Sequence, residues 1–393
     1  MTDTALQPPP GLAPPRPARA VTGAVAVTIA CVLPVFLLGG LAVQMGEDLG
    51  FSPAGLGLAV SVYFGVGALA SVPSGVLAER YGPTMVARAG ILLSAACLLA
   101  VAGLARSYAV LLGLLALAGT ANALGQLASN AALARHVPPR RQGLSFGVKQ
   151  AAIPVATLLA GATVPTVALT AGWRWAFVAA AGAALAALPT VPAREPRPAR
   201  TAAPARAGRA TAALVVVGAA GTFAAAAANA LGTFVVDSAA GRGLTPGLAG
   251  LTLTLGSAVC VGARVTVGWL ADRRATGHVA LIAGMLVVGA AGLGLLAVAG
   301  PVPLVAGVLL GFGLGWAWPG LMTFAVVRLH PRAPAAATSI TQTGVYAGGC
   351  LGPLGLGAVA AHAGYPTMWL VAAASMVLAA ALMLTGSRML ARR

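Results

Sequence analysis

The sequence predicts an all-α membrane protein with twelve transmembrane helices in two six-helix halves. Three observations support this fold class: the composition, the lengths of the apolar runs and an internal repeat. Of the 393 residues, 59% are hydrophobic and 8% are charged, and the mean hydropathy is +0.91. Soluble domains carry about 25% charged residues. The chain is therefore expected to lie in a lipid bilayer.

Apolar runs separated by short polar loops give the number of spans. A transmembrane helix needs about 20 apolar residues. Twelve runs of suitable length are present, at 21–45, 53–77, 84–104, 108–133, 143–169, 173–192, 211–236, 247–271, 278–299, 302–327, 335–361 and 366–387.

Basic residues are distributed unequally between alternate loops, which indicates the orientation. If the N-terminus is inside, the cytoplasmic segments contain nineteen of the 24 Lys and Arg residues, and the opposite loops contain Arg106, Arg174 and Arg242. The other two, Lys149 and Arg264, lie within spans. This asymmetry places both termini in the cytoplasm and predicts an integral cytoplasmic membrane protein. The net charge of +17 thus reflects membrane topology, and no basic face with interleaved aromatic residues suggests nucleic-acid binding.

The polar segments divide the chain into five parts. Residues 1–20 contain six prolines and are expected to form a disordered cytoplasmic tail. Residues 21–193 form the N-terminal half, 194–210 a cytoplasmic linker and 211–388 the C-terminal half. Residues 389–393 form a short cytoplasmic tail.

A repeat at an offset of about 193 residues relates the two halves. The segment GVLAER, which contains Gly75, Glu79 and Arg80, matches GWLADR, which contains Gly268, Asp272 and Arg273. Further landmarks match at 192 or 193 residues: Pro53 with Pro246, Pro139 with Pro331, Gln150 with Gln342, and Gly172 with Gly364. Repeats of the same topology, related by an axis along the membrane normal, occur in one large class of transporters.

These motifs resemble those of the major facilitator superfamily from about residue 20 to residue 388. The segment GVLAERYGPTMVAR is similar to the family's signature loop between spans two and three, with Glu79 in place of Asp. The segment GWLADRRATG is its second copy, and GWRWAF at 172–177 is similar to the common opening of the sixth span. The resemblance implies a pseudo-two-fold axis and transport by alternating access. It also implies a conformational switch formed by Gly75, Glu79, Arg80, Gly268, Asp272 and Arg273. The two acids can pair with the neighbouring Arg or with a helix end of the opposite half.

Polar residues within the spans are the candidates for substrate binding. Lys149 and Arg264 are the charged ones. The uncharged ones are Asn122, Gln126, Gln150, Asn229, Gln342 and Tyr346. Asn122, Gln126 and Asn130 recur every four residues and therefore share one helix face. Other roles stay open, since Lys149 can also snorkel to the cytoplasm and the amides can also join helices within one half.

The charges within the spans favour a small organic anion, such as a carboxylate, as the substrate. Two cations and no carboxylate lie deep in the spans, and guanidinium geometry suits a carboxylate. The pattern Arg264-x-x-x-Gly268-x-x-x-Asp272 is similar to the eighth span of organic-anion members of the family, in which the Arg binds the anion. Ser71 occupies the first-half position equivalent to Arg264, so the paired arginines of nitrate carriers are absent.

Two alternatives to an anion transporter remain open. A proton-coupled drug or metabolite antiporter typically has an Arg in the fourth span and a Gly-Pro run in the fifth, where this chain has Leu117 and Ile153-Pro154. A membrane enzyme or receptor is the more distant alternative, because no acid, base and nucleophile converge in the sequence. The sequence contains no cofactor or metal motif. The expected protein is a monomer, with the bilayer, a small molecule and, as one option for coupling, protons as its partners.

Overall fold

The computed structural model describes residues 17–51, 53–192, 208–244, 246–331 and 333–391. The expected linker lies mostly outside these residues, as do most of the N-terminal tail and the last two residues. Three helices of the structure extend into segments that the sequence predicted to be tails or linker. The first helix begins at Pro17, within the expected tail, and the first helix of the second half begins at Gly208, within the expected linker. The last helix continues to Ala391.

The predicted all-α architecture is confirmed. The first half contains α1 (Pro17–Gly40), α2 (Ala42–Leu49), α3 (Pro53–Tyr81), α4 (Pro83–Leu104), α5 (Tyr108–His136), η1 (Pro139–Arg141), α6 (Gln142–Thr163), η2 (Val164–Ala168), α7 (Leu169–Ala171), α8 (Trp173–Ala186) and η3 (Leu188–Thr190). The second half contains α9 (Gly208–Ala240), α10 (Pro246–Asp272), α11 (His278–Leu296), α12 (Pro301–Leu310), η4 (Gly311–Gly315), α13 (Trp318–Leu329) and α14 (Pro334–Ala391).

The helices are consistent with the twelve expected spans. Within the described residues, ten helical segments are long and apolar enough to cross a membrane. One of them, 55 residues long, contains two expected spans, which a non-helical residue divides at Gly364. The helix α8, with 14 residues, falls below the length of a full span, and the turn η3 continues the same apolar run.

Two equivalent glycines explain the turns that precede the last span of each half. Gly172 has φ +96° and Gly364 has φ +79°. Positive φ is disfavoured for residues with a Cβ, so glycine is suited to both positions. These residues are 192 positions apart, and both turns lead into an aromatic residue, Trp173 or Tyr365. The repeat seen in the sequence is therefore also present in the backbone.

Each half has its own hydrophobic core. One core is formed by residues between Val27 and Val191 only, and the other is dominated by residues from Val217 to Met383. Large side chains such as Leu69 and Val302, which are 81% and 76% exposed, cover the outer surface. In a bilayer these side chains face lipid, where apolar surface needs no burial inside the protein.

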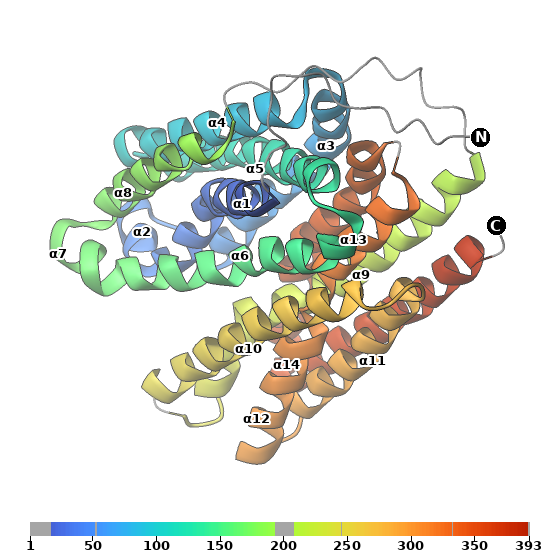
Figure 1. Ribbon diagram of the computed structural model, residues 1–393. Helices are drawn as coiled ribbons and strands as arrows, with labels where there is room; N and C mark the ends of the chain where they lie inside the picture. Colours follow the sequence, from blue (N-terminus) through green and yellow to red (C-terminus); the bar gives the residue numbers. More distant parts are fainter. Residues whose placement is uncertain (1–16, 52, 193–207, 245, 332, 392–393) are drawn as a thin grey trace, which may run out of the picture.

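The two halves meet mainly along two helix pairs, α3 with α14 and α6 with α10, with further contacts between α13 and α6 and between α14 and α5. In Figure 1 the first half, blue to green, and the second half, yellow to red, come together around α13 and spread apart toward α7 and α12. We call the end at which Glu79 lies in the last turn of α3 and Asp272 closes α10 the motif end. The halves are held together at this end by the contacts described below.

Candidate functional site

A cavity of about 70 Å³ lies between the two halves. Among the described residues, its wall is formed by Trp316, between η4 and α13, and by eight helices: α1, α3, α5, α6, α9, α10, α13 and α14. The lining residues from the first half are Val32, Val35, Phe36, Tyr63, Phe64, Asn122, Gln126, Gln150 and Ile153. Those from the second half are Ala225, Asn229, Arg264, Trp316, Trp318, Pro319, Met322, Thr323, Gln342, Val345 and Tyr346.

Seven of the eight residues predicted to bind substrate line this cavity. Helices α5 and α6 supply Asn122, Gln126 and Gln150 from the first half. Helices α9, α10 and α14 supply Asn229, Arg264, Gln342 and Tyr346 from the second. The eighth residue, Lys149, is not among the described residues of the lining.

Arg264 is almost completely buried, at 1% exposure, and contacts both halves. Its Nη1 donates to the carbonyl oxygen of Gln150 in α6 at 2.5 Å. Its Nε and Nη2 both donate to the carbonyl oxygen of Trp316, at 3.2 and 2.9 Å. The guanidinium carbon also lies 5.7 Å from the centre of the Trp316 ring, within the range of a cation–π contact. The carbonyl dipoles of Gln150 and Trp316 and the ring of Trp316 therefore stabilise the buried charge of Arg264.

A break in the tenth span presents the Trp316 carbonyl to Arg264. The regular helix α12 ends at Leu310, and the chain then forms the π-helical turn η4. Trp316 follows with φ −115° and ψ 1°, which is not helical. A π turn interrupts the regular hydrogen-bond ladder and is often found at functional sites. Here it also places the rings of Trp316 and Trp318 on the cavity wall.

Lys149 is buried within the first half and does not reach the cavity. Its Nζ donates to the amide oxygen of Gln126 at 2.5 Å and to that of Asn130 at 2.7 Å. All three amides of the predicted stripe lie on α5: Gln126 and Asn130 accept from Lys149, and Asn122 and Gln126 line the cavity. The hydrogen bond from Lys149 thus fixes the side chain of Gln126, which lines the cavity.

Several buried polar atoms on the cavity wall have no hydrogen-bond partner within the described part of the chain. Among them are Oδ1 of Asn122, Oε1 of Gln150 and Nε1 of Trp318. Buried polar groups normally have a partner, so unpaired ones on a cavity wall are available to water or to a ligand. Asn229 differs, since its Nδ2 donates to the carbonyl oxygen of Ala225 in its own helix at 2.8 Å.

At the motif end, each acid of the repeated motif caps a helix of the opposite half. The carboxylate of Asp272 accepts from the backbone N–H groups of Gly143 and Leu144, at 2.6 and 2.9 Å, in the first turn of α6. The carboxylate of Glu79 accepts from the N–H of Ala336, at 2.9 Å, in the first turn of α14. The first N–H groups of a helix lack partners within the helix and attract negative charge.

The other motif residues surround these caps. A Cβ on Gly268 would lie 2.5 Å from the carbonyl oxygen of Gly143, so glycine permits the close approach of α10 to α6. Gly75 is buried in α3. The arginines lie over aromatic rings, with Arg80 at 5.3 Å from the centre of Tyr81 and Arg273 at 3.6 Å from the centre of Trp269.

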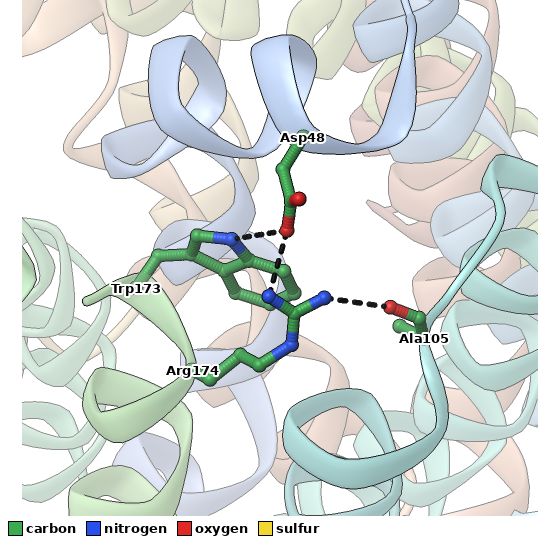
Figure 2. A network of polar contacts seen from close by, with 4 residues as sticks. All are labelled: Asp48, Ala105, Trp173 and Arg174. Atoms are coloured by element: carbon green, nitrogen blue, oxygen red, sulfur yellow. Dashed lines mark hydrogen bonds and ion pairs between the residues drawn. The ribbon is translucent and has the colours of Figure 1, made fainter.

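At the opposite end of the first half, a polar network joins α2, α8 and the segment after α4 (Figure 2). Oδ2 of Asp48 accepts from Nε1 of Trp173 at 3.0 Å and from Nη1 of Arg174 at 2.7 Å. Arg174 also donates to the carbonyl oxygen of Ala105 at 3.3 Å. The hydrogen bonds from Arg174 and Trp173 lower the pKa of Asp48. The Trp and Arg of the GWRWAF segment therefore anchor α2, a function that the sequence did not reveal.

Comparison with known proteins identifies the family. The model described as Major Facilitator Superfamily matches residues 24–353, and it matches again at 216–390. The chain belongs to the Major Facilitator Superfamily. Members of this superfamily are membrane transporters and not enzymes, so this chain is an integral membrane protein of a transporter family.

Solved structures of superfamily members share the fold. The proton:xylose symporter XylE, bound to 6-bromo-6-deoxy-D-glucose, matches with a TM-score of 0.79 and 14% identity, over 94% of this chain and 95% of XylE. The human organic anion transporter MFSD10 (TETRAN) matches with a TM-score of 0.74 and 17% identity, over 94% of this chain and 100% of MFSD10. No curated protein gives a significant sequence match. At identities this low, the matches show a common fold and do not identify the substrate.

Proposed function

We propose that this superfamily member is a secondary transporter that moves an organic anion, such as a carboxylate, across the cytoplasmic membrane by alternating access. One observation carries the proposal: Arg264 is the only charged side chain among the described residues that line the cavity. A single buried cation attracts an anion and repels a cation, and the surrounding low dielectric strengthens both effects.

The guanidinium of Arg264 has capacity for a ligand. A guanidinium carries five N–H donors, of which three are used in bonds to the carbonyls of Gln150 and Trp316. The remaining N–H donors suit a carboxylate. Nε1 of Trp318, which has no partner in the described residues, is a further donor on the same wall.

The rest of the wall favours an anion with an apolar or aromatic body. Six of the lining side chains are aromatic: Phe36, Tyr63, Phe64, Trp316, Trp318 and Tyr346. Phe64 and Tyr346 come from opposite halves and lie 6.0 Å apart between ring centres. The amides of Asn122, Gln126, Gln150, Asn229 and Gln342 add polar contacts that would fix the orientation of the ligand.

The positive-inside asymmetry assigns the motif end to the cytoplasm. Contacts join the halves at this end, through Asp272 with Gly143 and Glu79 with Ala336. With this orientation, the described state is closed to the cytoplasm and the cavity faces outward. Inward opening would require these two caps to break. The two six-helix halves, 21–193 and 211–388, would then move as the rigid bodies of a monomeric transporter.

Uptake by purified protein in proteoliposomes tests the proposal. We expect uptake of a labelled aromatic carboxylate, such as benzoate, and no uptake of the lipophilic cation tetraphenylphosphonium. Arg264→Gln should abolish the uptake. Arg242→Gln is the matched control, because Arg242 also donates to backbone carbonyls, those of Leu296 and Val298, but does not line the cavity. Uptake of the cation alone would favour the drug or metabolite antiporter instead.

A further inference from the structure

Pro154 interrupts the hydrogen-bond ladder of α6 next to the cavity. In a regular α-helix, the N–H of residue 154 would donate to the carbonyl oxygen of Gln150, four residues earlier. Proline has no N–H, so this bond is absent. Gln150 is buried, with 3% of its surface exposed, and a buried carbonyl without a donor is unfavourable. The carbonyl of Gln150 is thus available to a donor from outside its helix.

Arg264 of the opposite half supplies that donor. Its Nη1 lies 2.5 Å from the carbonyl oxygen of Gln150, while Nε and Nη2 bond to the carbonyl of Trp316 in its own half. The guanidinium is therefore fixed between one carbonyl from each half. In both cases an irregularity of a helix makes the acceptor available: Pro154 in α6, and the π-helical turn η4 before Trp316.

A second proline in the same chain shows the same relationship within one half. Pro34 in α1 leaves the carbonyl of Ala30 without its helical donor, and Oγ of Ser94 in α4 donates to this carbonyl at 2.7 Å. This bond joins two helices that belong to the same half. The bond at Gln150 has a charged donor and crosses between the halves, so it depends on their relative position.

We propose that Pro154 is a positioning residue for Arg264, and that the bond from Arg264 to the Gln150 carbonyl is a latch that forms only while the motif ends of α6 and α10 are together. Close packing on this interface supports a state-dependent bond. A Cβ on Gly147 would lie 3.1 Å from Cα of Gly268, so the backbones of α6 and α10 pack closely beside the bond from Arg264 to Gln150. The proposal rests on the proposed function, because the same bond orients the guanidinium of Arg264 on the cavity wall.

Hydrogen–deuterium exchange of the unliganded protein in lipid nanodiscs tests the latch. The readout is the exchange of the Gly143 and Leu144 amides, which bond to Asp272 across the same interface. Pro154→Ala restores the N–H that Gln150 lacks, so the carbonyl returns to its own helix. We expect about tenfold faster exchange of the two amides, because one hydrogen bond to a charged group is lost. Pro34→Ala is the control and should leave this exchange unchanged.

A double-mutant cycle separates the latch from a general effect of straightening α6. If Pro154 acts through Arg264, Pro154→Ala should add no further increase in exchange to an Arg264→Gln protein. Additive effects, or unchanged exchange in both Pro154→Ala and Pro154→Val, would overturn the proposal. No ligand is present, so the outcome does not depend on whether the transported molecule is an anion.

Discussion

The carboxylate of Asp272 accepts a hydrogen bond from the backbone N–H of Gly143, at 2.6 Å, across the boundary between the two halves. Glu79 makes the equivalent contact with Ala336 at 2.9 Å. Asp272 follows Glu79 by 193 residues, and Ala336 follows Gly143 by 193 residues, so both the acceptor and the donor obey the repeat. The motif acids are therefore helix caps exchanged between the halves.

Asp272→Asn should weaken closure of the motif end. The variant keeps the shape of the side chain but removes the negative charge that favours the N-terminus of α6. We expect the ratio of closed to open motif ends to fall about tenfold, equivalent to about 1.4 kcal/mol. Double electron–electron resonance between spin labels at 141 and 276, in a cysteine-free background, measures this ratio. A distance distribution equal to that of the parent would contradict the capping role.

Gly143→Ala should separate α6 from α10. A Cβ on Gly143 would lie 2.6 Å from the carbonyl oxygen of Gly268 and 2.8 Å from Oδ1 of Asp272. Relief of both clashes requires α6 and α10 to move apart. We expect a lower apparent unfolding midpoint and faster exchange of the Leu144 amide. Gly262→Ala in α10 is the matched control, because nothing lies within 4 Å of its added Cβ. If both variants behave alike, close packing at Gly143 is not important.

Lys149→Met should destabilise the first half. The substitution keeps a long side chain but leaves the amide oxygens of Gln126 and Asn130 without their donor. Each buried unsatisfied acceptor costs about 1–3 kcal/mol. The apparent unfolding midpoint measures the effect, with Thr157→Val as a control, since that hydroxyl bonds only to a carbonyl of its own helix within the described residues. An unchanged midpoint would show that these amides have other partners.

Asp48→Asn should give a small loss of stability that depends on pH. Hydrogen bonds from Arg174 and Trp173 lower the pKa of Asp48 in the folded protein. The charged carboxylate therefore stabilises the fold above the ordinary pKa near 3.9, and this stabilisation is lost as the pH falls through the lowered folded pKa. Its side chain is 44% exposed, so solvent screening limits the effect to about 1 kcal/mol or less.

Unfolding midpoints of the parent and the Asp48→Asn variant, measured in parallel between pH 7 and pH 3, check this dependence. The difference between them should be constant from pH 7 to pH 5 and should shrink toward pH 3. A difference that grows on acidification has the opposite sign and would exclude the network in Figure 2 as its source.

Residue spacing was sufficient to predict the spans and the repeat, because apolar length and loop charge are local properties of the chain. It also predicted that Arg264 and Gln150 lie within spans and are candidates for substrate binding. The donor–acceptor bond between them could not be predicted, because it depends on a carbonyl that Pro154 leaves free and on the packing of two halves. Trp318 was missed since an aromatic residue in an apolar run gives no polar signal.

Lys149 shows why a polar residue within a span need not line the cavity. Lys149 and Gln150 are adjacent, so their side chains leave α6 about 100° apart. Gln150 faces the cavity, and Lys149 points into the first half toward α5. A sequence without a clear amphipathic pattern does not fix the rotation of a helix about its axis, and in α6 that rotation decides which neighbour meets the ligand.

Thermal stabilisation of the purified protein by a ligand panel tests the central claim most directly, since a ligand that binds the native state raises its apparent stability. The panel contains aromatic and aliphatic carboxylates together with lipophilic cations. The account predicts that carboxylates raise the unfolding midpoint, that Arg264→Gln removes this shift and that Arg242→Gln retains it. Stabilisation by the cations alone, or a carboxylate shift that survives in Arg264→Gln, would contradict an anion site at Arg264.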